Sequence, residues 1–194
     1  MKNIVVFASG YGSNFQAIIE ASEQGHLKAH VVGLICDQPQ AYVIHRAQLH
    51  HVPVKVIVRS DYASKEAMDK AILEQCQIWN ADYLILAGYM RLLSPFIVHT
   101  YPSRILNIHP SLLPKYKGLH AIEQAIAHHE KEYGITIHYV DEGMDTGEII
   151  VQRKFSVEEI DVDIIKHEIS KLEQETYVQV IQTLLEEEHE KSSH

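Results

Sequence analysis

The stretch NIVVFASGYGSNF at residues 3–15 decides the fold, because it joins a buried strand to a helix through a glycine turn. Asn3 to Ala8 form a short apolar run, which is typical of a strand that is buried on both faces. Gly10 and Gly12 interrupt the run, and a helical spacing of apolar residues starts at Phe15. Strand, turn and helix in this order predict the first unit of a parallel α/β fold.

Strands and helices continue to alternate along the chain. The pattern predicts strands at 30–36, 54–58, 83–87 and 105–108, and helices at 41–50, 64–78 and 118–130. Residues 134–140 and 148–155 alternate in polarity, which indicates an antiparallel addition to the sheet. A helix with one apolar face is predicted from about 163 to 188. We therefore expect an α/β, Rossmann-like fold: a mostly parallel twisted sheet with helices on both faces and an antiparallel addition near the C-terminal end.

Length, charge and cysteine content limit the class of protein. A chain of 194 residues that is 46% hydrophobic predicts a single domain over 1–194, with an acidic, mobile tail from about 187 to 194. The formal net charge of −9 disfavours nucleic-acid binding. Cys36 and Cys76 form no paired motif, and no apolar run is long enough to cross a membrane. We expect a cytoplasmic protein with small-molecule partners, no nucleic acid and no membrane, either a monomer or a homodimer.

The glycine turn is a candidate phosphate site. Free backbone amides at the helix start that follows Gly12 would attract an anion. A dinucleotide fingerprint would need a third glycine, but position 15 is Phe, and the lysine of a P-loop is missing as well. On this feature alone, phosphate binding and a plain turn in which Ser13 caps the helix are equally supported.

Asn107 and His109 lie at the carboxyl end of a predicted strand, where ligands of parallel sheets bind. An imidazole titrates near neutral pH and an amide can donate to an oxyanion, so this pair suits acyl transfer or proton shuttling. Asp145, in a turn that contains glycines, is expected to lie beside His109, to raise its pKa and to orient its ring. The alternative is an ordinary surface or core histidine, since the chain has fourteen. No zinc motif or serine elbow is present, so we expect no metal and no covalent intermediate.

Five motifs, in this order and spacing, closely resemble the phosphoribosylglycinamide branch of the folate-dependent formyltransferases. They are Gly12-Ser13-Asn14, Ala87 to Ser94, Leu106 to Pro114, Gly118 to Ala121 and Asp141 to Gly147. The match covers nearly the whole chain. The resemblance implies an enzyme of purine biosynthesis that transfers the formyl group of 10-formyltetrahydrofolate, its formyl-donor cosubstrate, to the amine of phosphoribosylglycinamide.

The resemblance also implies a role for individual residues. The catalytic residues are Asn107, His109 and Asp145. The residues that bind the ribonucleotide are Gly12, Ser13, Asn14, Ser170, Lys171, Leu172 and Glu173. The residues that bind folate are Lys65, Met90, Arg91, Leu92, Leu93, Asn107, Asp141, Glu142, Gly143, Met144 and Asp145. Two interpretations of Glu173 stay open, contact with the substrate amine and a solvated helix face, because the residues after it depart from the usual family pattern.

Three other functions are compatible with some of these motifs. A methionyl-tRNA formyltransferase and a hydrolase that releases formate share the catalytic trio, but each normally carries an additional domain. The compact length of this chain therefore favours the ribonucleotide branch. A module that binds nucleotide at the glycine turn and performs no chemistry is the alternative from a different class.

Overall fold

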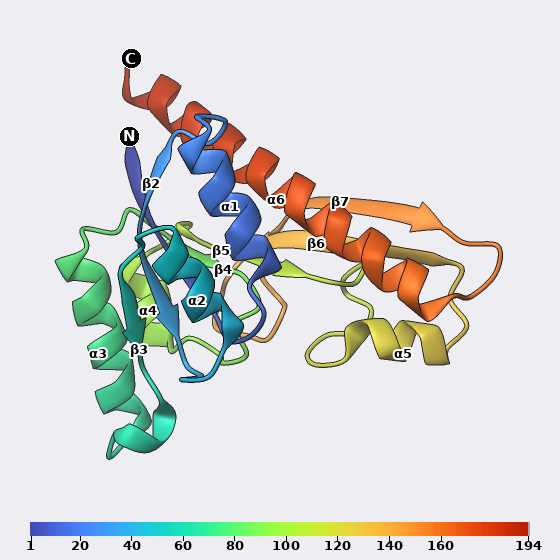
Figure 1. Ribbon diagram of the computed structural model, residues 1–194, viewed down its shortest axis with the longest axis horizontal. Coiled ribbons are helices and arrows are strands. Elements are labelled where there is room, and N and C mark those ends of the chain that lie inside the picture. Colours follow the sequence, from blue (N-terminus) through green and yellow to red (C-terminus); the bar gives the residue numbers. More distant parts are fainter. Residues whose placement is uncertain (194) are drawn as a thin grey trace.

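Seven strands in residues 1–193, the part of the chain that this computed structural model describes, form one sheet (Figure 1). The strands are β1 (Lys2–Ala8), β2 (Ala29–Cys36), β3 (Val54–Val56), β4 (Tyr83–Leu86), β5 (Ile105–His109), β6 (Glu132–Tyr139) and β7 (Ile149–Ser156). Their order across the sheet is β3-β2-β1-β4-β5-β6-β7. Pairing is parallel from β3 to β5, whereas β6 and β7 are antiparallel. The predicted parallel sheet and its antiparallel addition are confirmed.

The helices occupy the positions that the sequence predicts, with one addition. They are α1 (Ser13–Glu23), α2 (Tyr42–Leu49), α3 (Lys65–Ile78), α4 (Pro95–Thr100), α5 (Ala121–Ala127) and α6 (Val162–Ser192), with a 3-10 turn at Arg59–Asp61. The sequence does not predict α4, because six residues are too few for a helical period to stand out. The Ser94 hydroxyl accepts from the Ile97 N–H and starts this helix, and Pro95 follows directly.

The side chains of β1 alternate between two apolar layers. Ile4 and Val6 pack with α1, α2, α5 and α6 on one face of the sheet. Val5 and Phe7 pack with α3 and α4 on the other face. All four side chains are fully buried, which explains why β1 is an unbroken apolar run. Helices therefore cover both faces of the sheet, as the sequence predicts (Figure 1).

The acidic tail is more ordered than the sequence suggests. α6 continues to Ser192, well past the expected start of a mobile tail at about residue 187. The Glu188 carboxylate accepts hydrogen bonds from the side chains of Lys2, Tyr83 and Arg104. His194 lies outside the described residues. Neither α6 nor any other helix in residues 1–193 is both long and apolar enough to cross a membrane.

Candidate active site

The carboxyl ends of β1, β4 and β5 lie at one edge of the sheet, because these strands are parallel neighbours. The Ser9 N–H, after β1, donates to the Gly88 carbonyl (3.1 Å), and the Ser9 hydroxyl accepts from the Met90 N–H (2.9 Å). The glycine turn and the predicted folate segment 90–93 are therefore tied together. β5 delivers Asn107 to the same edge. A ligand site at this edge matches the general rule for open parallel sheets.

Two donors on α2 bind carbonyl groups of the glycine turn. The Gly10 carbonyl accepts from the Val43 N–H (3.0 Å), and the Tyr11 carbonyl accepts from Arg46 Nε (2.9 Å). Gly12 has a φ of 83°, and an added Cβ would lie 2.5 Å from Val43 Cγ2, so only glycine fits here. Gly12 also occupies the N-cap of α1 and has no side chain to cap the helix, which leaves the first amides of α1 for an anion. The alternative in which the next residue caps the helix is therefore wrong.

Glu173 lies on α6, near Asn14 of the glycine turn. Burial raises the pKa of Glu173 to about 7, although the neighbouring Asn14 side chain lowers it. Asn14 Oδ1 is buried and has no hydrogen-bond partner within residues 1–193. One turn further along α6, the Tyr177 hydroxyl donates to the Leu86 carbonyl at the end of β4 (2.8 Å). Glu173 is thus partly buried near the strand ends, and its interpretation as a solvated helix face is wrong.

The other three residues of α6 that are predicted to bind the ribonucleotide have different surroundings. Lys171 is exposed, and Leu172 packs against the apolar core. Ser170 accepts a hydrogen bond from Gln174 within the helix (3.0 Å).

A single carboxylate, that of Asp145, faces four polar groups, two of which belong to the predicted catalytic residues. Asp145 Oδ2 accepts from the Gly118 N–H (2.8 Å) and lies 3.5 Å from His109 Nδ1. Asp145 Oδ1 lies 3.5 Å from Asn107 Nδ2 and 3.7 Å from His138 Nε2. The structure therefore brings the amide, the imidazole and the carboxylate together, although 36 residues separate His109 from Asp145 in the sequence.

The surroundings of Asp145 keep it ionised. Burial by itself raises its pKa, but the nearby His138 side chain and the Gly118 N–H, together with His109, outweigh burial and lower the pKa. Asp145 is therefore an anion at neutral pH.

His138 is a member of this cluster that the sequence analysis missed. It lies on β6 directly opposite Asn107 on β5. Its Nδ1 is 2.8 Å from the Tyr139 carbonyl and, as a carbonyl can only accept, carries a proton. In the neutral ring, His138 Nε2 therefore accepts from Asn107 Nδ2 (3.3 Å) and orients the amide. The register between β5 and β6 reveals this residue, and no spacing in the sequence indicates that register.

Beside the cluster lies a cleft of about 320 Å³. Nine of the eleven predicted folate residues line it: Met90, Arg91, Leu92, Leu93, Asn107, Asp141, Gly143, Met144 and Asp145. Met90, Leu92 and Met144 are exposed apolar side chains, which suit a flat organic ligand. Lys65 and Glu142 are not among its lining residues in 1–193; Lys65 begins α3, and Glu142 pairs with His99 (2.6 Å). Within the same residues, no group of three or more His, Cys, Asp or Glu could hold a metal ion.

Known proteins match this chain along nearly its whole length. A family model described as formyl transferase matches residues 2–181, so the chain belongs to the formyl transferase family. Phosphoribosylglycinamide formyltransferase from Bacillus subtilis (strain 168) is 45% identical over 186 residues, 95% of each chain. The enzyme of the same name from Escherichia coli (strain K12) is 40% identical and covers 80% of this chain and 73% of its own. The crystal structure of phosphoribosylglycinamide formyltransferase from Bacillus halodurans has a TM-score of 0.92 at 45% identity and covers 95% of each chain. The resemblance that the five motifs indicate is confirmed.

Proposed function

We propose that this chain transfers the formyl group of 10-formyltetrahydrofolate to the amine of phosphoribosylglycinamide and releases tetrahydrofolate. The observation that carries the proposal is the convergence of Asn107, His109 and Asp145 beside the cleft, at the same strand ends as the glycine turn. A substrate with a phosphate at one end and an amine at the other fits this arrangement. The names of the relatives support the same reaction.

The glycine turn and Glu173 suit the two ends of the ribonucleotide. Amides at the start of α1 would bind the phosphate. Asn14 Oδ1 is a buried acceptor without a partner in residues 1–193, and a ligand donor would satisfy it. A carboxyl group with a pKa of about 7 can take a proton from the ammonium form of the substrate, which frees the nitrogen lone pair for attack.

Transfer then proceeds through a tetrahedral oxyanion. The amine nitrogen bonds to the formyl carbon while the carbonyl electron pair moves onto oxygen. Asn107 supplies an amide donor, and His109, whose ring lies beside the anionic Asp145, supplies a second donor to the oxyanion. When the carbonyl re-forms, the bond to the folate nitrogen breaks; that nitrogen gains a proton as the amine loses one.

The contacts of His109 indicate which of its nitrogens serves the reaction. His109 Nε2 is 2.7 Å from the Tyr116 carbonyl, which can only accept, so Nε2 carries a proton. His109 Nδ1 is 3.5 Å from Asp145 Oδ2 and has the looser contact of the two. Because the Tyr116 carbonyl holds Nε2, we assign to Nδ1 the exchange of a proton with the substrate.

The test is a spectrophotometric assay with a 10-formyl folate analogue, with and without phosphoribosylglycinamide. We expect turnover only when the ribonucleotide is present. Turnover without the amine acceptor would indicate a hydrolase, and thermal stabilisation by both ligands without turnover would indicate a binding module; either result would contradict the proposal.

Replacement of His109 by Ala tests the assignment of the imidazole. We expect kcat to fall by roughly a hundred- to a thousandfold, the usual cost of losing one group that stabilises an oxyanion. The far-ultraviolet circular dichroism spectrum should stay unchanged, because the substitution removes a side chain from a cleft. An unaltered kcat would remove His109 from the mechanism.

A further inference from the structure

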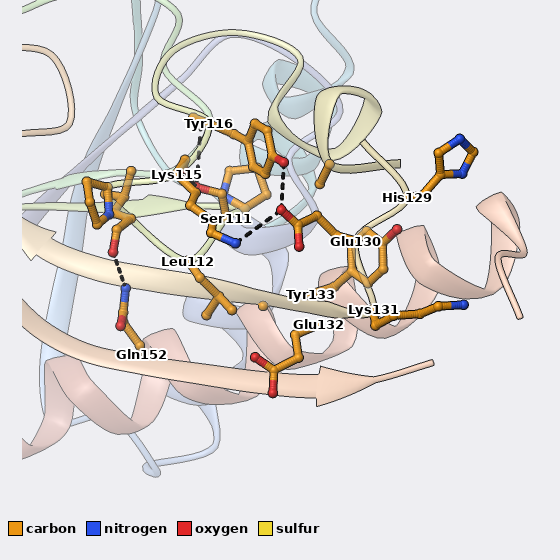
Figure 2. A pocket seen from close by; sticks show the side chains of 15 residues that line it. Ser111, Leu112, Lys115, Tyr116, His129, Glu130, Lys131, Glu132, Tyr133 and Gln152 are labelled. Carbon is orange, nitrogen blue, oxygen red and sulfur yellow. Dashed lines mark hydrogen bonds and ion pairs between the residues drawn. The ribbon is translucent and has the colours of Figure 1, made fainter. Parts of the chain in front are cut away.

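The segment 110–118, which joins β5 to α5, borders two separate cavities. The first is the cleft that contains Asp145. The second has a volume of about 470 Å³ and is lined by Lys115, Tyr116 and Glu130 among others (Figure 2). Pro110 borders both cavities. Side chains in the second cavity can therefore act on the cleft through the backbone of this segment.

The backbone of the segment contacts both the imidazole of His109 and the carboxylate of Asp145. The Tyr116 carbonyl accepts from His109 Nε2 (2.7 Å), and the Gly118 N–H donates to Asp145 Oδ2 (2.8 Å). Because the carbonyl of Tyr116 faces Nε2, the other ring nitrogen, Nδ1, is turned to Asp145. A rotation of the peptide after Tyr116 would disturb the imidazole directly and, two residues later, the carboxylate.

Tyr116 has an unfavourable backbone conformation, with a φ of 54°. A non-glycine residue keeps such a conformation only where its surroundings enforce it. The Tyr116 hydroxyl donates to Glu130 Oε1 (2.7 Å), and Lys115 Nζ donates to the same oxygen (3.1 Å). Figure 2 shows both groups pointing at the Glu130 carboxylate. Ser111 Oγ donates to the Lys115 carbonyl (2.6 Å) and closes the segment on itself.

We propose that Tyr116 and Glu130 are positioning residues for the reaction: their side-chain hydrogen bond holds the Tyr116 carbonyl where it fixes the imidazole of His109. The inference rests on the proposed formyl transfer, but it concerns residues outside the cleft. Tyr116 and Glu130 line the second cavity and are not among the residues that line the cleft in 1–193. Their loss should therefore change kcat and leave substrate binding almost unchanged.

Two substitutions at Glu130 and one at Tyr116 test the proposal. Glu130→Ala and Tyr116→Phe each break the side-chain hydrogen bond, and we expect kcat to fall by roughly ten- to a hundredfold, as for a slightly misplaced catalytic group. The KM of each substrate should change by less than about twofold, because neither residue touches the cleft. Glu130→Gln keeps an oxygen that accepts from the Tyr116 hydroxyl and should restore most of the activity.

Tyr133→Phe is the matched control. Tyr133 lines the same cavity, is 3% exposed, and its hydroxyl has no hydrogen-bond partner within residues 1–193. Removal of this hydroxyl should leave kcat at the wild-type value. Thermal unfolding of each variant measures whether a loss of activity reflects a loss of folded protein.

Nuclear magnetic resonance of the His109 ring gives a readout that does not depend on activity. We expect the 15N shifts of the folded wild type to show a proton on Nε2, with slow exchange, and Glu130→Ala to accelerate that exchange. Unchanged ring signals together with an unchanged kcat in Glu130→Ala would overturn the positioning role, whether or not Tyr116→Phe folds. An inactive wild type would instead contradict the proposed function, and the ring signals would still decide the positioning role.

Discussion

Replacement of Glu173 by Gln should make the protein more stable and less active at the same time. Burial raises the pKa of Glu173 to about 7, from an ordinary value of 4.5. At about 1.4 kcal/mol for each unit of pKa, ionisation of this carboxyl costs the folded state at most about 3.5 kcal/mol. Gln is neutral, has nearly the same shape and keeps an oxygen that can pair with Asn14.

The expected gain in stability depends on pH, and its direction follows from the raised pKa. Below about pH 4.5 the carboxyl group is protonated in both the folded and the unfolded chain, so it has no effect. Between about pH 4.5 and 7 the unfolded chain ionises first, and the unfolding free energy of the wild type falls as the pH rises. Above about pH 7 the full cost is present. The unfolding free energy of Glu173→Gln lacks this fall, because glutamine does not ionise.

Urea unfolding at pH 5, 6, 7 and 8 measures this effect. We expect Glu173→Gln and the wild type to differ by less than about 1 kcal/mol at pH 5, and the variant to be more stable by as much as about 3.5 kcal/mol at pH 8. Glu175→Gln, at an exposed position of the same helix, is the control and should match the wild type throughout. Formyl transfer by Glu173→Gln should fall, because the variant cannot accept a proton from the amine. A stability difference that does not change with pH would refute the assignment of a buried carboxyl.

Three further substitutions test the framework of the site. Gly12→Ala forces a Cβ against Val43 at a φ of 83°, so urea unfolding should show a loss of about 1–3 kcal/mol, and the KM of the ribonucleotide should rise while that of folate does not. Tyr177→Phe leaves the Leu86 carbonyl without its donor and should cost about 1–3 kcal/mol in the same measurement; an unaltered midpoint would contradict the role of this hydroxyl. Asp145→Asn should lower kcat at least tenfold and reduce stability at pH 7. Because the pKa of Asp145 is lowered, its stabilising charge is present above about pH 4 and lost as the pH falls, so the stability difference should shrink towards pH 3; a constant difference would argue against it.

The order of elements was readable from local patterns in the sequence. The apolar run before Ser9 and the glycines after it predict the first strand and turn, because burial on both faces and a positive φ each restrict the residue type at single positions. Short motifs around Asn107 and Asp145 predict the site for the same reason, since their chemistry is visible in the residue types. α4 was missed because six residues are too short to show a period.

Contacts between distant elements were not readable in this way. Nothing near His138 indicates that it lies opposite Asn107, because that pairing depends on the register between two strands. The hydrogen-bond partners of Glu188 lie more than 80 residues away in the sequence. The residue types of the acidic tail therefore predict a solvated tail and do not indicate these bonds.

The sequence by itself determined the class of fold, the glycine turn and the chemical groups at the strand ends, because each depends on local propensity or on the chemistry of a side chain. The packing of distant elements decided that Glu173 is half-buried, that His138 joins the cluster of Asp145, and that the Tyr116 carbonyl holds the ring of His109. Burial and hydrogen bonding change the pKa and the orientation of a group, and both depend on which elements pack against it.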